Sequence, residues 1–247
     1  MRLRIEFDVK CLRVPVCYNH IIQGFVYNLL SDSFKHFLHE KGFEYGGRRF
    51  KLFTFSRLFG HFRRVHDELV FHGPVTFYVS SPVEKFINEV ASSLVKKGVF
   101  SICGEELPVR EIHVLEKPFF DERLIFRTLS PITVYSTLMK ADGSKKTYYY
   151  SPYESEFNEL LKRNLMKKAS ILHKRFSEDF KIIPLNRKKC REVIVKYKGT
   201  VIKAWEGIFK VKGDPELLEV MYDAGLGSKN SAGFGMMEVV PNCSNRS

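Results

Sequence analysis

The sequence of 247 residues predicts the same order of strands and helices in each of its halves. In its first half, period-2 alternation of apolar residues predicts strands, and apolar residues three or four positions apart predict helices. The predicted elements are a strand at 2–9, helices at 20–30 and 32–41, strands at 51–58 and 69–80, a helix at 83–97 and a strand at 111–118. Apart from the short second helix, the order is β-α-β-β-α-β.

The second half repeats that order. Its predicted elements are a strand at 124–129 or 133–138, a helix at 155–168, strands at 192–197 and 201–212, a helix at 215–224 and a strand at 234–240. Pro215 suits the first position of its helix, and Gly225 is expected to end that helix in the left-handed conformation. Two such units predict an α+β chain of tandem ferredoxin-like (RRM-like, βαββαβ) domains, at residues 1–121 and 122–247.

Four of the 16 glycines lie in one segment near the C-terminus, residues 225–235. Glycine lets backbone N–H groups come close to a ligand, and N–H groups beside a helix end suit a phosphate. Paired glycines also occur in turns that bind nothing, and the segment matches neither a Walker A motif nor a dinucleotide fingerprint. Its candidate phosphate-binding residues are Gly225, Gly227, Lys229, Asn230, Ser231, Gly233 and Gly235.

The formal net charge of +12 is unevenly distributed. Eleven basic residues lie between Lys162 and Arg191, against only two acidic ones, Glu178 and Asp179. A run of charge is more often a solvated face than a binding site, but this concentration favours a polyanionic partner, above all a nucleic acid. A membrane surface is the competing polyanion, and the chain shows no basic amphipathic helix with a broad aromatic face.

Several classes of protein are disfavoured. The five cysteines are scattered without a C-x-x-C pair, which argues against a zinc ribbon and favours reduced thiols in a cytoplasm. We expect no metal and no cofactor, because no H-E-x-x-H motif or aspartate cluster occurs, and this disfavours a metal-dependent nuclease. No apolar run approaches the roughly 20 residues that span a membrane, and the N-terminus alternates like a strand rather than a signal peptide.

Three motifs, in order along nearly the whole chain, carry a resemblance. The first is VPVCYNHIIQGFVYNLL at 14–30, followed by FLHE at 37–40. The second is FKLFTFS at 50–56, followed by LSPI at 129–132. The third is the glycine segment GLGSKNSAGFG, which follows DPELL at 214–218. With these motifs the chain resembles the CRISPR-associated repeat-processing endoribonucleases, the Cas-six family of the RAMP superfamily.

The resemblance implies two ferredoxin-like domains and a metal-independent endoribonuclease of a prokaryotic antiviral defence system. Such enzymes cut precursor CRISPR RNA within each repeat to give guide RNAs. The 2′-hydroxyl of the RNA attacks the adjacent phosphate and leaves a 2′,3′-cyclic phosphate and a 5′-hydroxyl. The implied partner is CRISPR repeat RNA, with other CRISPR effector subunits as further possible partners, no membrane, and a monomer or homodimer as the state of assembly.

This chemistry needs a base, an acid and positive charge at the phosphate. The positions that match the family are Tyr27, His39 and Lys51. Tyr27 would orient or deprotonate the 2′-hydroxyl, although a tyrosine is a poor base unless Lys51 lowers its pKa. His39 would act as the general acid, or as the base if the substrate binds in the reverse pose. Lys51 would stabilise the charge that develops on the phosphate oxygens.

Each of these assignments has an alternative. A tyrosine on an amphipathic helix is more often a packing residue. His36 lies three positions before His39 on about the same helix face and is a second candidate for the active histidine. Arg48 and Arg49 are RNA-binding candidates that can share the cationic role of Lys51. If the histidine is not effective, the chain is a non-catalytic RNA-binding subunit of the same system.

Overall fold

The structure is a computed structural model, and it describes residues 1–241. The first half contains β1 (Arg2–Phe7), β2 (Leu12–Pro15), α1 (Asn19–Asn28), α2 (Asp32–Glu40), β3 (Phe43–Tyr45), β4 (Arg48–Phe50), β5 (Thr54–Phe55), β6 (Phe59–Val65), β7 (Glu68–Ser80), α3 (Glu84–Lys97), β8 (Val99–Ile102) and β9 (Glu105–Leu115). The second half contains β10 (Arg123–Thr128), β11 (Tyr135–Met139), β12 (Lys145–Tyr149), α4 (Ser155–Ile171), β13 (Phe180–Pro184), the 3-10 helix η1 (Arg187–Lys189), β14 (Arg191–Tyr197), β15 (Thr200–Glu206), β16 (Ile208–Gly213), α5 (Pro215–Ala224), the 3-10 helix η2 (Asn230–Ala232) and β17 (Met237–Val239).

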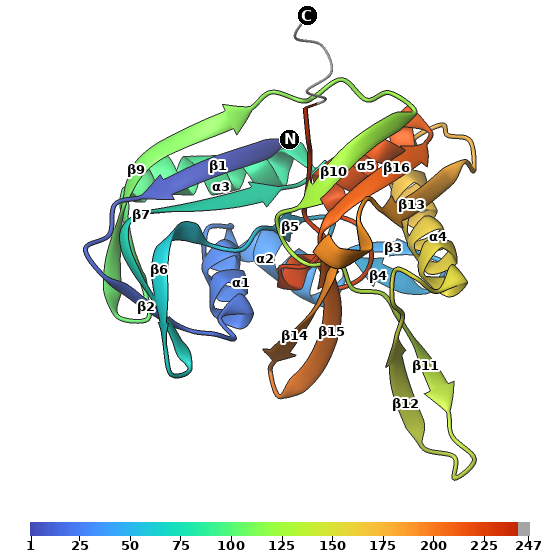
Figure 1. The fold of residues 1–247 in the computed structure, drawn as a ribbon. Helices are drawn as coiled ribbons and strands as arrows, with labels where there is room; N and C mark the ends of the chain where they lie inside the picture. Colours follow the sequence, from blue (N-terminus) through green and yellow to red (C-terminus); the bar gives the residue numbers. More distant parts are fainter. Residues whose placement is uncertain (242–247) are drawn as a thin grey trace, which may run out of the picture.

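The first sheet has the strand order β2-β7-β1-β9-β8, and β5 and β6 also pair with β7. Leu3, Ile5 and Phe7 point to one face of β1, where all three are buried. Helices α1 and α3 bury apolar residues in the same cluster, among them Phe25 and Phe86. The order β1-α1-β5-β7-α3-β9, with β1 between β7 and β9 and β5 paired with β7, is that of the predicted first ferredoxin-like unit (Figure 1).

The second sheet has the order β13-β16-β10-β17. Phe126 of β10 and Phe209 of β16 are cross-strand partners and are fully buried. They share a core with Phe157 of α4 and Leu217 of α5, so both helices cover this sheet. The tandem ferredoxin-like fold class is thus confirmed.

The predicted strand 192–197 does not belong to this sheet, and the predicted strand 201–212 belongs to it only from residue 208, as β16. The edge strand β13, which pairs with β16, was not predicted. Gly207 interrupts the long apolar alternation, so 200–206 pairs instead with 191–197 as the hairpin β14–β15. The alternative strand at 133–138 also lies outside the sheet, in the hairpin β11–β12. Both hairpins project from the body of the molecule (Figure 1).

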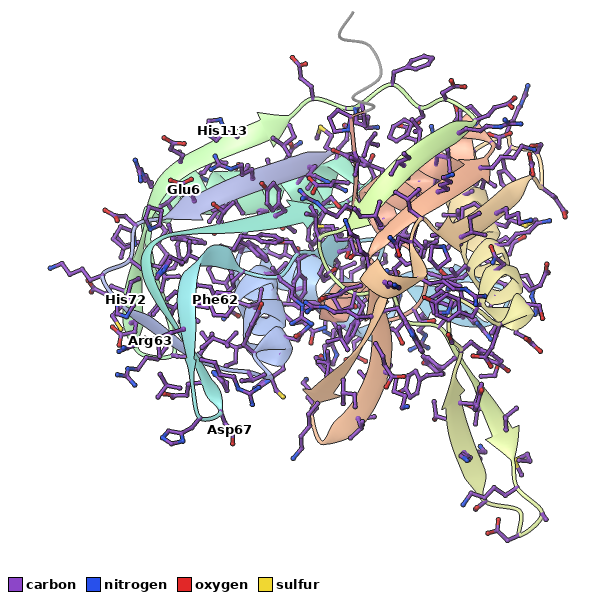
Figure 2. The ribbon with its side chains drawn as sticks, in the orientation of Figure 1. Glu6, Phe62, Arg63, Asp67, His72 and His113 are labelled. Atoms are coloured by element: carbon purple, nitrogen blue, oxygen red, sulfur yellow. The ribbon has the colours of Figure 1, made fainter. Side chains whose placement is uncertain are left out.

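Further differences concern short or exposed strands. The sequence did not predict β6, whose side chains, including Phe62 and Arg63, are nearly all exposed, so no alternation marks it (Figure 2). The predicted strand 51–58 reduces to β5, and Lys51 precedes that strand instead of opening it.

The two units share buried contacts. The side chain of Arg2 in β1 donates hydrogen bonds to the carbonyl oxygens of Tyr222 (2.6 Å) and Met237 (2.9 Å). Phe50 and Leu52 of the first half belong to the core of the second. Because side chains cross between the units in this way, the boundary between residues 121 and 122 stays a prediction.

Candidate active site

A pocket of about 620 Å³ opens between α1, α2 and the tip of the β14–β15 hairpin. Tyr27 comes from α1, His39 from α2, and Lys51 from the chain between β4 and β5. The three side chains predicted to be catalytic therefore line one pocket. The glycine-containing link between His39 and Lys51 forms the β3–β4 hairpin, which returns the chain to this pocket.

Helical periodicity explains how α1 and α2 build the two walls. On α1, His20, Gln23 and Tyr27 are three and four residues apart and face the pocket. On α2, the pocket-lining residues repeat with the same spacing, and they are Asp32, Lys35, His36, His39 and Glu40. The opposite, apolar face of each helix is buried in the core of the first half, the cluster that contains Phe25 and Phe86.

Tyr27 is held in place by its aromatic ring. The residue is 8% exposed, and its ring packs edge-on against Phe53 with a centroid separation of 5.7 Å. Its hydroxyl oxygen is buried and has no hydrogen-bond partner within the described residues. Burial raises the pKa of Tyr27 well above its ordinary value, and the nearby Tyr197 raises it further. The hydroxyl is thus a hydrogen-bonding group, and the alternative role of Tyr27 as a base is disfavoured.

His39 lies at the open side of the pocket. Its side chain is 73% exposed, and Nδ1 lies 3.1 Å from the Oε1 atom of Glu40. The hydrogen bond from His39 lowers the pKa of Glu40, so this carboxylate is charged and orients the imidazole. His36 lines the same pocket and also lowers the pKa of Glu40. Two histidines of α2 can therefore reach a ligand there.

Lys51 is about half-buried, and its Nζ atom lies 5.4 Å from the centroid of the Tyr27 ring. Burial lowers the pKa of Lys51, the nearby Glu40 raises it, and Lys198 lowers it again. Lys51 thus lies beside Tyr27, the tyrosine whose pKa it was expected to lower. Burial nevertheless keeps the pKa of Tyr27 raised, so its hydroxyl stays protonated.

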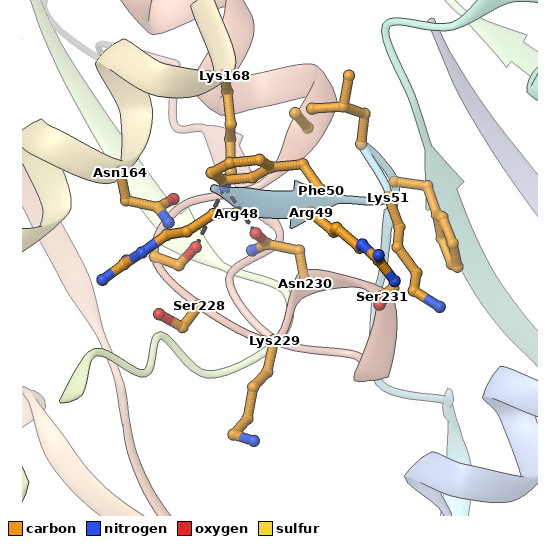
Figure 3. A pocket seen from close by; sticks show the side chains of 14 residues that line it. Arg48, Arg49, Phe50, Lys51, Asn164, Lys168, Ser228, Lys229, Asn230 and Ser231 are labelled. Carbon is orange, nitrogen blue, oxygen red and sulfur yellow. Dashed lines mark hydrogen bonds between the residues drawn. The ribbon is translucent and has the colours of Figure 1, made fainter. Parts of the chain in front are cut away.

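Lys51 also lines a second pocket, of about 230 Å³, beside the glycine segment (Figure 3). Arg48 and Arg49 come from β4, and Lys229, Asn230 and Ser231 from the glycine segment. Arg48, Arg49 and Lys229, the basic residues predicted to bind RNA, thus line the same pocket as the predicted catalytic lysine. Arg49 is partly engaged, because it donates to the carbonyl of Glu40 (2.7 Å) and pairs with Glu44.

The glycines of this segment serve the fold. The N–H groups of Gly225, Gly233 and Gly235 donate to the carbonyls of Met221, Asn230 and Pro131. These three N–H groups are therefore not presented to a phosphate, which corrects the reason for predicting them as ligand-binding groups. A Cβ on Gly235 would lie only 1.9 Å from the carbonyl oxygen of Leu226, so the fold requires glycine there. Gly227 is buried.

Gly225 differs from its prediction in a second way. It ends α5 as expected, with its N–H bonded to Met221, but its φ of 79° and ψ of 159° are outside the left-handed helical region. The chain therefore leaves the helix in an extended direction and enters the glycine segment.

Comparison with known proteins decides the family. Residues 13–113 match the family model described as CRISPR-associated protein Cas6, N-terminal, and residues 111–239 match the one described as CRISPR associated protein Cas6, C-terminal. The chain belongs to the Cas6 family. It is 31% identical to the "CRISPR-associated endoribonuclease Cas6" of Pyrococcus furiosus, over 98% of this chain and 89% of that protein. It is 30% identical to the "CRISPR-associated endoribonuclease Cas6 1" of Methanocaldococcus jannaschii, over 96% of this chain and 92% of that protein.

Solved structures share the fold. One described as "CRISPR associated protein Cas6" has a TM-score of 0.79 and 28% identity and covers 98% of this chain and 99% of its own. Another, described as "An RAMP protein binding different RNA substrates", has a TM-score of 0.79 and 20% identity, with 98% of this chain and all of that chain covered.

Some residues of this Cas6 pocket were missed by the sequence analysis. His20 and Gln23 lie on the same face of α1 as Tyr27, and that spacing could have found them. Tyr197 and Lys198 could not be found in this way, because they reach the pocket from a hairpin about 170 residues further along the chain.

Lys168 was predicted only as one charge of a basic segment, but it is an internal residue. It is 2% exposed, and its ammonium donates to the carbonyls of Gly225 (2.8 Å) and Gly227 (3.2 Å) and to Oδ1 of Asn230 (2.6 Å). Burial lowers the pKa of Lys168 to about 7. Figure 3 shows this lysine reaching from α4 into the glycine segment.

The other charges of 162–191 are spread over α4, β13, η1, the first residue of β14 and the connecting chain. Lys174 pairs with Glu216 and Glu219 of α5. With Lys168 internal and Lys174 paired, fewer charges of this segment are free for a polyanion than its sequence indicated, and a polyanion site there stays a prediction.

Three observations concern residues 1–241 only. No group of three or more His, Cys, Asp or Glu side chains is arranged there to hold a metal ion. None of the helices in that range is both long enough and apolar enough to cross a membrane. Four cysteines in the range are free thiols, and Cys243 lies outside the described residues.

Proposed function

We propose that this protein is a metal-independent endoribonuclease that cuts precursor CRISPR RNA within its repeats. The observation that carries the proposal is the shared pocket of Tyr27, His39 and Lys51. Family membership and the names of the two relatives support the reaction class. The second pocket, which shares Lys51, supplies a basic path for the RNA backbone toward the reacting phosphate.

The proposed reaction needs no water and no cofactor. The 2′-oxygen of one nucleotide forms a bond to the adjacent phosphorus, and the bond from phosphorus to the 5′-oxygen of the next nucleotide breaks. The 2′-hydroxyl proton passes to a base, and the leaving 5′-oxygen receives a proton from an acid. The products are a 2′,3′-cyclic phosphate and a 5′-hydroxyl.

The pocket offers a group for each task. His39 is exposed and oriented by Glu40, so it can give a proton to the leaving oxygen. Tyr27 offers a neutral hydroxyl that can orient the 2′-oxygen by a hydrogen bond. Lys51 supplies positive charge where the phosphate becomes more negative. His20 and His36 also line the pocket, so the base can come from a second histidine.

The test is to incubate the protein with its cognate repeat RNA in EDTA and to identify the product ends. We expect one cut per repeat, a cyclic phosphate on the upstream product, and no cut when the nucleotide at the cleavage site is 2′-deoxy. His39→Ala should lower the single-turnover rate by about 10²- to 10⁴-fold, the usual contribution of a general acid or base. His36→Ala and His20→Ala are the matched variants, and a comparable loss in one of them would assign it the second proton transfer.

Two results would contradict the proposal. Cleavage that strictly requires a divalent metal would exclude the metal-independent mechanism. Tight binding of repeat RNA without cleavage, equal for the wild type and His39→Ala, would make the protein a non-catalytic RNA-binding subunit.

A further inference from the structure

The β14–β15 hairpin belongs to the second half of the chain, but its tip reaches the pocket of the first. Tyr197 and Lys198 both line the pocket that Tyr27, His39 and Lys51 line. The strands pair from Arg191 with Glu206 to Tyr197 with Thr200, which leaves only Lys198 and Gly199 in the turn. Such a two-residue turn is short and stiff, so the tip presents its side chains in a defined direction.

Gln23 fixes this tip to the pocket. The hydroxyl of Tyr197 donates a hydrogen bond to the Oε1 atom of Gln23. The Nε2 atom of the same Gln23 donates to the carbonyl oxygen of Ser231, at 2.7 Å. One side chain of α1 thus holds both the hairpin and the glycine segment against the wall that carries Tyr27.

The conformation of Lys198 is unusual for a lysine. Its φ is 46° and that of Gly199 is 81°, so both turn residues are in the positive-φ region that a type I′ turn requires. Asparagine or glycine normally takes the first of these positions, because a side chain with a Cβ is strained there. Strained backbone conformations cluster at functional sites, so the strain at Lys198 indicates a role for its side chain.

Two lysine–tyrosine pairs then face the same space. The Nζ atom of Lys198 lies 5.9 Å from the centroid of the Tyr197 ring, and that of Lys51 lies 5.4 Å from the centroid of the Tyr27 ring. Glu40 lines the same pocket and raises the pKa of Lys51, but within residues 1–241 it pairs with His39 and with neither lysine. Lys198 lowers the pKa of Lys51, so the two ammonium groups repel each other, and an anion between them would relieve that repulsion.

We propose that Lys198 is a second phosphate-contacting lysine, which acts with Lys51 on the phosphodiester that is cut. This inference rests on the proposed function. Lys51 approaches the phosphate from the first half of the chain and Lys198 from the second, so the charge that develops on the phosphate oxygens is stabilised from two sides. Gln23 and Tyr197 are positioning residues, because they hold the turn that carries Lys198.

The sharpest variant is Lys198→Asn. It removes the charge and creates the Asn-Gly turn that a type I′ hairpin prefers, so the hairpin should fold at least as well as in the wild type. Lys196→Gln is the matched control, since Lys196 is an exposed lysine of the same hairpin that does not line the pocket. Lys198→Arg keeps a positive charge at the tip and tests whether charge is what matters.

The measurement is the single-turnover rate of repeat cleavage in EDTA, with affinity measured separately on a repeat RNA that carries a 2′-deoxy nucleotide at the cut. We expect Lys198→Asn to cleave about 10- to 100-fold more slowly, as for loss of one group that stabilises the transition state. Affinity should fall by no more than about fivefold, the effect of losing one exposed ionic contact. Lys196→Gln should cleave like the wild type, and Lys198→Arg should recover most of the rate.

The outcomes separate this inference from the function on which it rests. If the wild type cleaves the repeat and Lys198→Asn cleaves at the same rate, the proposed function stands and the role of Lys198 is refuted. Equal losses in Lys198→Asn and Lys196→Gln would also refute it, because they would indicate general charge on the hairpin. If the wild type does not cleave repeat RNA at all, both proposals are overturned together.

Discussion

Burial decides what Tyr27 can do in the pocket. A tyrosine acts as a base only when its hydroxyl is ionised, and the raised pKa of Tyr27 keeps it neutral at physiological pH. Lys51 was the group that could have lowered this pKa, and it lies over the ring without overcoming the effect of burial. The side chain therefore keeps only the weaker of the two roles that the sequence analysis considered.

Tyr27→Phe tests this role. We expect the single-turnover cleavage rate to fall by about tenfold, the effect of losing one hydrogen bond. Stability should be unchanged or slightly higher, because the variant removes a buried hydroxyl that has no partner. Rates measured from pH 6 to 9 should keep the wild-type pH profile. A loss as large as that of His39→Ala, with a changed profile, would show that Tyr27 transfers a proton.

At the scale of the element, the glycine segment is a folded loop with its own support. Its carbonyl oxygens face inward and converge on the Lys168 ammonium, which offers one N–H for each of three acceptors. Asn230 adds to this by donating from Nδ2 to the carbonyls of Leu226 and Phe234. The segment can therefore present Lys229 and Ser231 to a ligand only while Lys168 holds it together.

Lys168→Met should destabilise the protein by about 2–3 kcal/mol, because buried carbonyls lose their donor. Lys167→Met, at the next and more exposed position of α4, is the control and should stay within about 0.5 kcal/mol of the wild type. Urea unfolding measures both values, and hydrogen exchange at residues 225–231 should quicken only in Lys168→Met. Equal stability of the two variants would show that the ammonium does not support the loop.

The pH dependence of this difference has a defined sign. The pKa of Lys168 is about 7 in the folded protein, against 10.5 ordinarily, so between these values the unfolded chain holds a proton that the folded chain has released. The free energy of unfolding of the wild type, relative to Lys168→Met, should therefore rise with pH above 7. Below pH 7 both states are protonated, and the difference should be smallest and constant.

For the whole molecule, the two ferredoxin-like units are joined through the ends of the chain. Arg2 is 1% exposed, bonds to two carbonyls of the second unit and lies with its guanidinium 3.6 Å from the centroid of the Tyr222 ring. The N-terminal ammonium lies 3.0 Å from Asp223. Asn19 and Thr54 add hydrogen bonds to the glycine segment. These contacts fix the position of α1 relative to the glycine segment. Since α1 lines the first pocket and the glycine segment lines the second, the two pockets stay side by side.

Arg2→Met should lower the free energy of unfolding by about 2–4 kcal/mol, since it leaves buried carbonyls without donors and removes the contact with the ring. The loss weakens the contact between units, so urea unfolding followed by tryptophan fluorescence and by circular dichroism should become less coincident. Arg13→Met is the control, because Arg13 is exposed and its ion pair with Glu68 is worth less than about 1 kcal/mol. An unchanged, coincident transition in Arg2→Met would mean that the units are joined by other contacts.

Much of this architecture could be read from local patterns. The helices α1, α3 and α5 and the strands β1 and β7 were predicted close to their observed bounds, because each has one apolar face and clear end signals. Gly98, for example, ends α3 with a φ of 68°. Strands without a buried face were missed, as β6 was, and a long apolar run was not divided at Gly207. Such errors arise because local alternation shows that a strand forms but not which strand it pairs with.

The sequence by itself determined the helices and the two-fold repeat of the fold, since periodicity is a property of neighbouring residues, and its resemblance to the family named Tyr27, His39 and Lys51 as candidates. Only the tertiary structure decided which of those residues meet, that Lys168 is an internal support, and that Lys198 enters the pocket from the other half of the chain. The physical reason is that burial, hydrogen bonding and charge at a site depend on side chains brought together from distant segments, and the neighbours of each residue along the chain carry no record of them.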